Sequence, residues 1–302
     1  MNEVQELTPA ALSRRRALVG MGVAAGSMLS SSLRAQPAPA WPLWQVHGQD
    51  GRRAYLFGET PARASPWHDA RIEALLPTCS VLWNETNQQW RGDRQGVIKR
   101  YGMDLQTPLP RKLDAARLAR LEQVAALAKM PLESLAPLRP WTAALTLEGA
   151  YYAQLKRNPA HSAENILIPI ARQAGIAQAS EFAAQDDVCA FMGEFTPEQD
   201  LQFLDYTLDN LLAGPEANER IHASWARGDA APAEQVVLRT KTQYPAIHER
   251  MVLDRNRGWV SRFAQMLAAD KPAMVVVGLY HMAGPDSVVA QLRAAGYRLS
   301  RI

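Results

Sequence analysis

The sequence has few cysteines: Cys79 and Cys189 alone occur, and their wide spacing matches no metal-binding motif. Each lies in an apolar stretch, which favours two buried free thiols, although an oxidising compartment would permit a disulfide. The common catalytic signatures are also missing, because the chain has no Gly-x-Ser-x-Gly, no phosphate-binding loop and no His-Glu-x-x-His. The function must therefore rest on residues that belong to none of these motifs.

A surplus of charge of either sign is missing too. The chain has 33 basic and 30 acidic residues, and removing residues 1–35 leaves 29 basic and 28 acidic ones. No region concentrates Lys and Arg as a nucleic-acid surface would require, so nucleic acid is excluded as a partner. A composition of 47% hydrophobic and 21% charged residues is typical of a folded protein.

Long apolar runs are absent. The run from Ala17 to Leu33 is too short and too polar for a comfortable membrane span. It follows the cationic cluster Arg14–Arg16 and precedes small residues, which is typical of a secretory signal of the twin-arginine type; an uncleaved anchor is the alternative. We predict a signal peptide at 1–35, a single domain at 36–302 with no stable membrane span, and a periplasmic or secreted location in a bacterium.

Short apolar runs alternate with segments of helical periodicity. The runs predict strands at 53–58, 80–86, 177–181, 273–279 and 297–301. A turn signal at Asp50 and Gly51 predicts a hairpin between the first of these strands and the run before it. Strand–helix–strand units favour parallel pairing, so the sequence predicts an α/β fold with a mixed central sheet, flanking helices and a large helical insertion at about 89–270.

Capping residues predict where several helices begin. Ser65, Asp114 and Thr196 are the predicted N-caps of three helices, and Pro285 is predicted to open the last one. The N-terminus of that last helix would place a partial positive charge beside the preceding residues.

Ionisable residues follow four of the predicted strands: Glu59, Glu85, Glu181 and His281. The carboxyl ends of parallel strands meet at one edge of a sheet, where ligands of α/β proteins bind. Carboxylates and an imidazole gathered there could bind a divalent metal or perform acid–base chemistry. Each also has a structural interpretation, because such a carboxylate often caps a helix or pairs with an arginine, and a histidine can bond a backbone carbonyl.

Arg255 and Asn256 open a predicted helix. The arginine could bind an anion, and a surface ion pair with Asp254 or Glu249 is the alternative. We expect the His281 ring to face the same pocket as the strand-exit carboxylates and to be partly open to solvent.

Several segments resemble the TraB/GumN family, which is related to the Tiki and erythromycin-esterase groups. The most specific are "RNRGW" and "VGLYHMAGPD", and the others are "LWQVHGQDGRRAYLFGE", "SVLWNET", "LRPWTAAL" and "AENILIPIARQAGI". The resemblance spans roughly 41–302 and implies an α/β sheet with helical additions.

The resemblance implies a metal-dependent hydrolase of peptidase type. The residues that match the family motifs are Glu85, Glu181, Arg255, Asn256 and His281. Glu85 and Glu181 would bind a divalent metal or act as base, and His281 would be a metal ligand or general acid. Arg255, with Asn256, would hold the substrate.

The chain departs from the family where Gly-x-x-His is usual. Pro61 stands in place of the histidine and offers no ligand atom. Glu59 is a possible accessory group, but it lies two positions earlier. Two hypotheses therefore stay open: a hydrolase with an altered active site, and a non-catalytic periplasmic protein that keeps the pocket to bind a peptide or small molecule.

Overall fold

The computed structural model describes residues 41–302 of the chain. The predicted signal peptide lies outside the described residues. Among the residues described, no helix has both the length and the apolar character needed to cross a membrane.

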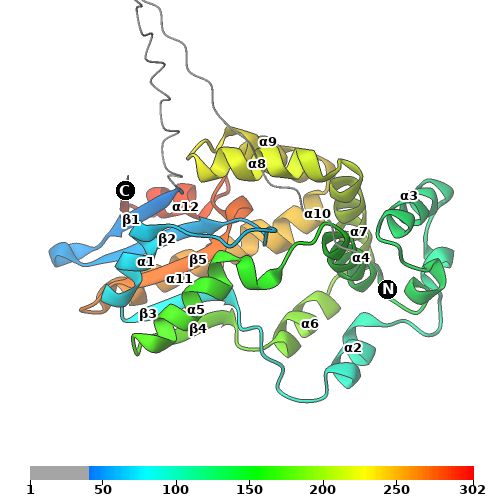
Figure 1. The fold of residues 1–302 in the computed structure, drawn as a ribbon, viewed down its shortest axis with the longest axis horizontal. Coiled ribbons are helices and arrows are strands. Elements are labelled where there is room, and N and C mark those ends of the chain that lie inside the picture. Colours follow the sequence, from blue (N-terminus) through cyan, green and yellow to red (C-terminus); the bar gives the residue numbers. More distant parts are fainter. Residues whose placement is uncertain (1–40) are drawn as a thin grey trace, which may run out of the picture. The chain divides into compact units, whose positions relative to one another are not determined.

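The fold is built on a six-stranded mixed sheet with the order β4-β3-β5-β2-β1-β6. The strands are β1 (Leu43–His47), β2 (Arg53–Glu59), β3 (Val81–Thr86), β4 (Ala177–Phe182), β5 (Ala273–Gly278) and β6 (Arg298–Arg301). Strands β4, β3, β5 and β2 run parallel, whereas β1 is antiparallel to both β2 and β6 (Figure 1). The predicted mixed α/β sheet is confirmed, including β5 beside β3 and the pairing of the C-terminal strand.

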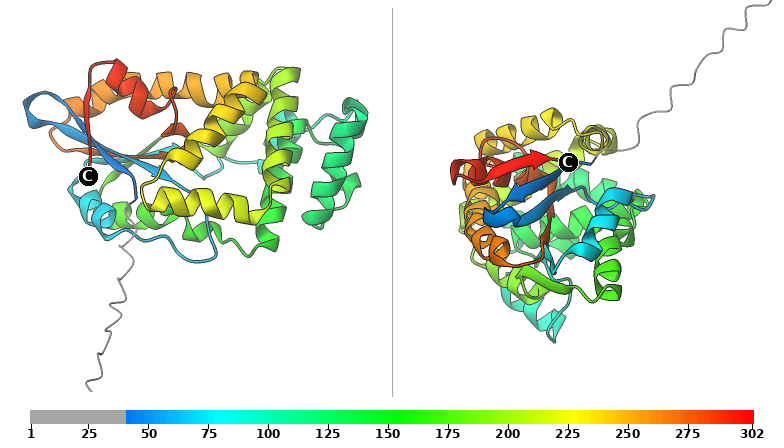
Figure 2. Two further views of the ribbon diagram at one scale, coloured as in Figure 1. Left: turned by 90° about the horizontal axis from the view of Figure 1, so that it is seen from above. Right: turned by 90° about the vertical axis from the view of Figure 1, so that its left-hand side faces the viewer.

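Helices flank the sheet and form most of the chain between β3 and β5, which also contains β4. They are α1 (Ala70–Leu75), α2 (Arg94–Gly102), α3 (Ala115–Leu127), α4 (Pro140–Gln154), α5 (Ala163–Gln173), α6 (Gln185–Gly193), α7 (Pro197–Leu212), α8 (Pro215–Ala226), α9 (Ala231–Gln243), α10 (Pro245–His248), α11 (Asp254–Ala268) and α12 (Val288–Ala294). Figure 2 shows α11 and α12, in orange and red, along one side of the sheet and α5, in green, along the other. The central strand β5 is buried along nearly its whole length, as its continuous apolar run requires.

Two of the predicted helix starts are confirmed and two are wrong. The Asp114 side chain accepts from the N–H of Arg117, and Thr196 forms a capping box with Gln199. The helix predicted to begin at Ser65 instead begins at Ala70, because the Asp69 carboxylate accepts from the first free backbone N–H groups.

The last helix was also misplaced by the sequence pattern. Helix α12 begins at Val288, not Pro285, and Ser287 is its N-cap. Gly284 has a φ of 82°, a left-handed conformation that a helix cannot include. The helix N-terminus that was expected beside His281 therefore begins three residues further along the chain than the sequence pattern predicts.

Apolar side chains form two clusters. One surrounds the sheet and the other lies among the helices α3, α4, α6 and α7. Cys79 is buried in the first cluster and Cys189 in the second, so the two thiols are not neighbours.

Helix α8 is attached to the sheet through a close approach at Gly58. Trp225 is fully buried, and its indole N–H donates to the carbonyl of Gly58 over 2.7 Å. A Cβ atom at position 58 would lie 2.6 Å from the Trp225 ring. Glycine is therefore required for the indole to lie against strand β2.

Candidate functional site

Arg255 lies at the centre of a buried charge cluster at the carboxyl ends of β3, β4 and β5. Its Nη2 donates to Glu85 Oε2 and to Glu181 Oε2, each over 2.7 Å, and its Nε donates to Glu181 Oε2 over 3.1 Å. Because β3 and β4 are parallel neighbours, their two glutamates leave the sheet at the same edge. The side chain of Arg255 is 7% exposed.

The predicted alternative for Arg255, a surface pair with Asp254 or Glu249, is wrong. Arg257 makes those contacts instead, with its Nη1 3.1 Å from Glu249 Oε1 and 3.2 Å from Asp254 Oδ1. Arg255 and Arg257 lie two positions apart on α11, so they point to opposite sides of the helix.

His281 is fixed in one orientation by Asn256. Its Nδ1 lies 2.8 Å from Asn256 Oδ1, and Asn256 Nδ2 donates to the carbonyl of Asp286 over 2.8 Å. Because that amide nitrogen is the donor, Asn256 Oδ1 must accept, which assigns the proton of the neutral imidazole to Nδ1. The Nε2 lone pair then faces Arg255 Nη1 at 3.4 Å and lies 3.7 Å from Glu85 Oε2.

The prediction that the His281 ring is partly open to solvent is wrong. The residue is 8% exposed, since the ring packs on Trp259 at a centroid distance of 4.5 Å. The predicted meeting of His281 with Glu85 and Glu181 at one sheet edge does match the structure, with Arg255 between the three. Whether these groups are catalytic stays a prediction.

The cluster fixes the charge states of its members. Burial is the main reason that the pKa of His281 falls to about 4, with Arg255 adding to the effect and Glu85 opposing it. Burial alone would raise the pKa of Glu85, but Arg255 and the N–H of Gly278 outweigh it and hold that pKa at about 2. At neutral pH the imidazole is therefore neutral and the Glu85 carboxylate is ionised.

Glu59 is not part of this cluster. Its Oε2 accepts from the N–H of Glu164, near the start of α5, over 3.0 Å. Burial, followed by the charge of Glu164, raises the pKa of Glu59 to about 8. Glu59, Pro61 and Glu164 line a second cavity of about 340 Å³, which shares Gly278 and Tyr280 with the Arg255 side. Glu59 therefore accepts a hydrogen bond from the backbone at the N-terminus of α5.

The side chains of the cluster do not fit the divalent metal that the resemblance implies. Within residues 41–302, no group of three or more His, Cys, Asp or Glu side chains is arranged to hold a metal ion. The Arg255 guanidinium lies between Glu85 and Glu181, in the position that a bound cation would need. A cationic side chain of the protein is therefore already shared by the two carboxylates.

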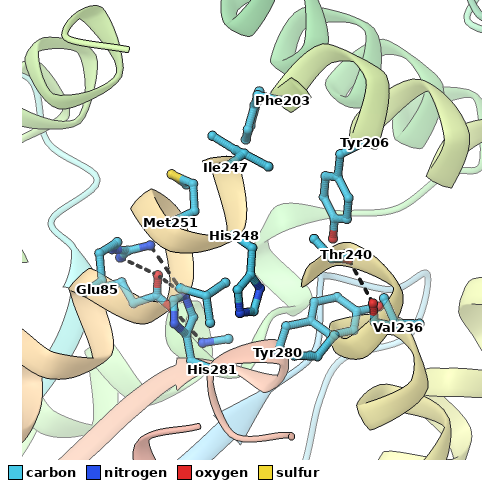
Figure 3. A pocket seen from close by; sticks show the side chains of 14 residues that line it. Glu85, Phe203, Tyr206, Val236, Thr240, Ile247, His248, Met251, Tyr280 and His281 are labelled. Atoms are coloured by element: carbon cyan, nitrogen blue, oxygen red, sulfur yellow. Dashed lines mark hydrogen bonds and ion pairs between the residues drawn. The ribbon is translucent and has the colours of Figure 1, made fainter. Parts of the chain in front are cut away.

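A cavity of about 290 Å³ opens beside the cluster (Figure 3). Its walls are mainly apolar and come from α7, α9, α10, α11, the carboxyl ends of β3 and β5 and the turn after β5. A π-helical turn, Glu249–Leu253, joins α10 to α11 and contributes Met251 and Val252 to the wall. Such turns often occur at functional sites, so this turn supports the cavity as the binding site.

Sequence reasoning missed several residues of this cavity. They include Phe203, Tyr206, Thr240, Ile247, His248, Met251 and Tyr280. They are dispersed over three helices and two turns, so no spacing in the sequence relates them to Glu85 or His281. Tyr280 directly precedes His281 and was the one residue that the motif around the histidine could have indicated.

A known protein family matches most of the chain. The sequence profile of the TraB/PrgY/gumN family matches residues 42–301. No curated protein matches the chain. The matched range contains every strand of the sheet and every residue of the Arg255 cluster.

Proposed function

The chain belongs to the TraB/PrgY/gumN family, and we propose that it is an exported, non-catalytic protein that binds a small molecule or peptide in the cavity beside Arg255. One observation carries the proposal: Arg255 donates to both Glu85 and Glu181, so the carboxylates that could activate water or bind a metal are already engaged by a side chain of the protein. The cavity remains open beside this closed cluster.

The charge states support binding rather than acid–base catalysis. A general base or acid works best when its pKa lies near the working pH. The pKa of Glu85 is about 2 and that of His281 is about 4. Both groups are therefore weak bases at neutral pH, and neither is in the protonated form that a general acid needs, because His281 is neutral and Glu85 is ionised.

The second candidate is a metal-dependent hydrolase with an altered site. The 3.7 Å separation of His281 Nε2 and Glu85 Oε2 favours it, because the two side chains already face the same point. For this function Arg255 would have to leave both carboxylates, which the buried ion pairs oppose.

Metal content and ligand binding separate the two candidates. The purified full-length protein should contain no stoichiometric divalent metal, as measured by elemental mass spectrometry. Pro61→His tests the missing histidine, and Ala62→His is the matched control, because it adds an imidazole at the neighbouring position. One firmly bound ion per wild-type chain, together with peptidase activity, would contradict the proposal.

Binding is tested with 4-butylanisole, an uncharged apolar probe. It should bind the wild-type protein in calorimetry and raise its melting temperature, because a ligand that binds only the folded state stabilises it. Met251→Trp should abolish this binding by filling the cavity, since Met251 is a partly exposed wall residue. Equal binding to the wild type and the filled variant would place the ligand elsewhere.

A further inference from the structure

His248, the last residue of α10, has one ring nitrogen without a partner. The residue is 3% exposed, and its Nε2 lies 3.1 Å from Asp286 Oδ2. Its Nδ1 is buried and makes no hydrogen bond to any of the described residues. Leaving a buried polar atom unsatisfied costs about 1–3 kcal/mol, so such an atom calls for an explanation.

Asp286 determines the chemical character of this nitrogen. Burial alone would raise the pKa of Asp286, but hydrogen bonds from Lys241 and His248 outweigh it and lower that pKa. Lys241 Nζ lies 2.7 Å from the same carboxylate oxygen. An ionised carboxylate only accepts hydrogen bonds, so His248 Nε2 carries the proton. In the neutral imidazole, Nδ1 is then a hydrogen-bond acceptor.

His248, which carries this buried acceptor, belongs to the wall of the cavity beside Arg255. His248 is one of the residues that line it, and Figure 3 shows the ring between Met251 and Tyr280. The Thr240 hydroxyl in the same wall is already used, because it donates to the carbonyl of Val236 over 2.8 Å. Besides the apolar walls, the Tyr206 and Tyr280 side chains and the Arg255 cluster, a ligand in the cavity would therefore meet an acceptor that needs a donor.

We propose that His248 Nδ1 selects the ligand, which is an uncharged amphipathic molecule with an O–H donor attached to a compact apolar body. The inference rests on the proposed function and specifies the class of ligand. The cavity of about 290 Å³ has room for an apolar group whose volume equals that of on the order of ten water molecules. An anionic ligand is disfavoured, because Arg255 is already paired with Glu85 and Glu181, and the ligand would meet both this acceptor and the ionised Glu85.

The test compares 4-butylphenol with 4-butylanisole, its methyl ether, which has the same apolar body but no donor. Calorimetric titration of the full-length wild-type protein should show about tenfold tighter binding of the phenol, the value of one satisfied buried hydrogen bond. In His248→Gln, the terminal amide can still donate to Asp286, but the Nδ1 acceptor is lost. This variant should bind both probes with equal affinity.

His248→Asn is the complementary variant, because its amide oxygen can take the place of Nδ1 while the contact with Asp286 is lost. It should keep part of the preference for the phenol. Circular dichroism and thermal unfolding establish that both variants are folded. If the wild type binds both probes equally, the role of His248 is refuted while the cavity remains a binding site. If neither probe binds, the proposed function fails as well.

Discussion

Arg255→Met tests whether the charge cluster holds the fold together. The substitution keeps much of the apolar volume of the side chain but leaves two glutamates at the sheet edge without their cation. Breaking a buried ion pair by removing one partner costs about 3–5 kcal/mol, because a charge remains buried and uncompensated. The side chains of Glu85 and Glu181 are 23% and 16% exposed, so water reaches them in part. We therefore expect a loss of about 3 kcal/mol in the free energy of unfolding.

The measurement is urea unfolding at neutral pH, followed by circular dichroism and tryptophan fluorescence. Arg257→Met is the matched control, since Arg257 lies on the same helix and its side chain is 59% exposed. Its pairs with Glu249 and Asp254 are at the surface, where an ion pair contributes about 0–1 kcal/mol. The control should therefore lose at most about 1 kcal/mol.

The pH dependence provides an independent check. In the wild type, the pKa of Glu85 is about 2, below the ordinary value of 4.5. The stability that the ionised Glu85 contributes to the folded protein is therefore present above about pH 4.5 and is lost as the pH falls toward 2. Without Arg255, burial raises this pKa, so the variant becomes more stable relative to the wild type as the pH falls. The reasoning is refuted if Arg255→Met lowers the free energy of unfolding no more than Arg257→Met does. It is also refuted if the loss of stability in Arg255→Met is equal at about pH 7 and about pH 4.

Three further predictions follow from the fold and the sequence. Gly58→Ala should destabilise the protein by about 1–3 kcal/mol and so lower its melting temperature, because its Cβ would lie 2.6 Å from the Trp225 ring. An unchanged melting temperature would contradict this. Glu59→Gln should stabilise the protein at about pH 9 and have little effect at about pH 4. The reason is that a folded-state pKa of about 8 makes the wild type lose stability as the pH rises from 4.5 to 8. Urea unfolding at both pH values tests this, and a pH-independent effect would count against it. Replacing Arg14 and Arg15 by lysine should keep the protein in the cytoplasm, as measured by fractionation, whereas unchanged export would exclude the twin-arginine route.

Strands and many helix starts could be predicted because their signals are local. A strand buried on both faces needs a continuous apolar run, as in β5, and Asp114 and Thr196 each lie beside the N–H groups that they cap. The start of α1 was wrong because Ser65 and Asp69 are both good capping residues, and only the surrounding packing selects Asp69. The order of strands in the sheet depends on contacts between distant segments, which no local pattern contains.

The residues of the charge cluster could be predicted from strand exits and from the family resemblance, but their arrangement could not. Arg255 and Arg257 have the same side chain and nearly the same sequence neighbourhood, yet the first is buried between two carboxylates and the second lies at the surface. The burial of His281 depends on Trp259, from another element. His248 belongs to no motif, and its free Nδ1 can be recognised only when its neighbours in space are known.

The place of β5 in the sheet has a consequence for the rate of folding. This strand pairs with both β2 and β3, and Glu85 touches Gly278 across 193 positions of sequence. The entropic cost of closing a loop grows only with the logarithm of its length, so the long loop lowers stability little. Contacts between residues so far apart in the sequence nevertheless slow folding. During synthesis β2 and β3 emerge long before the strand that separates them, so each has an unpaired edge. The nascent chain is therefore exposed to aggregation until β5 has been made.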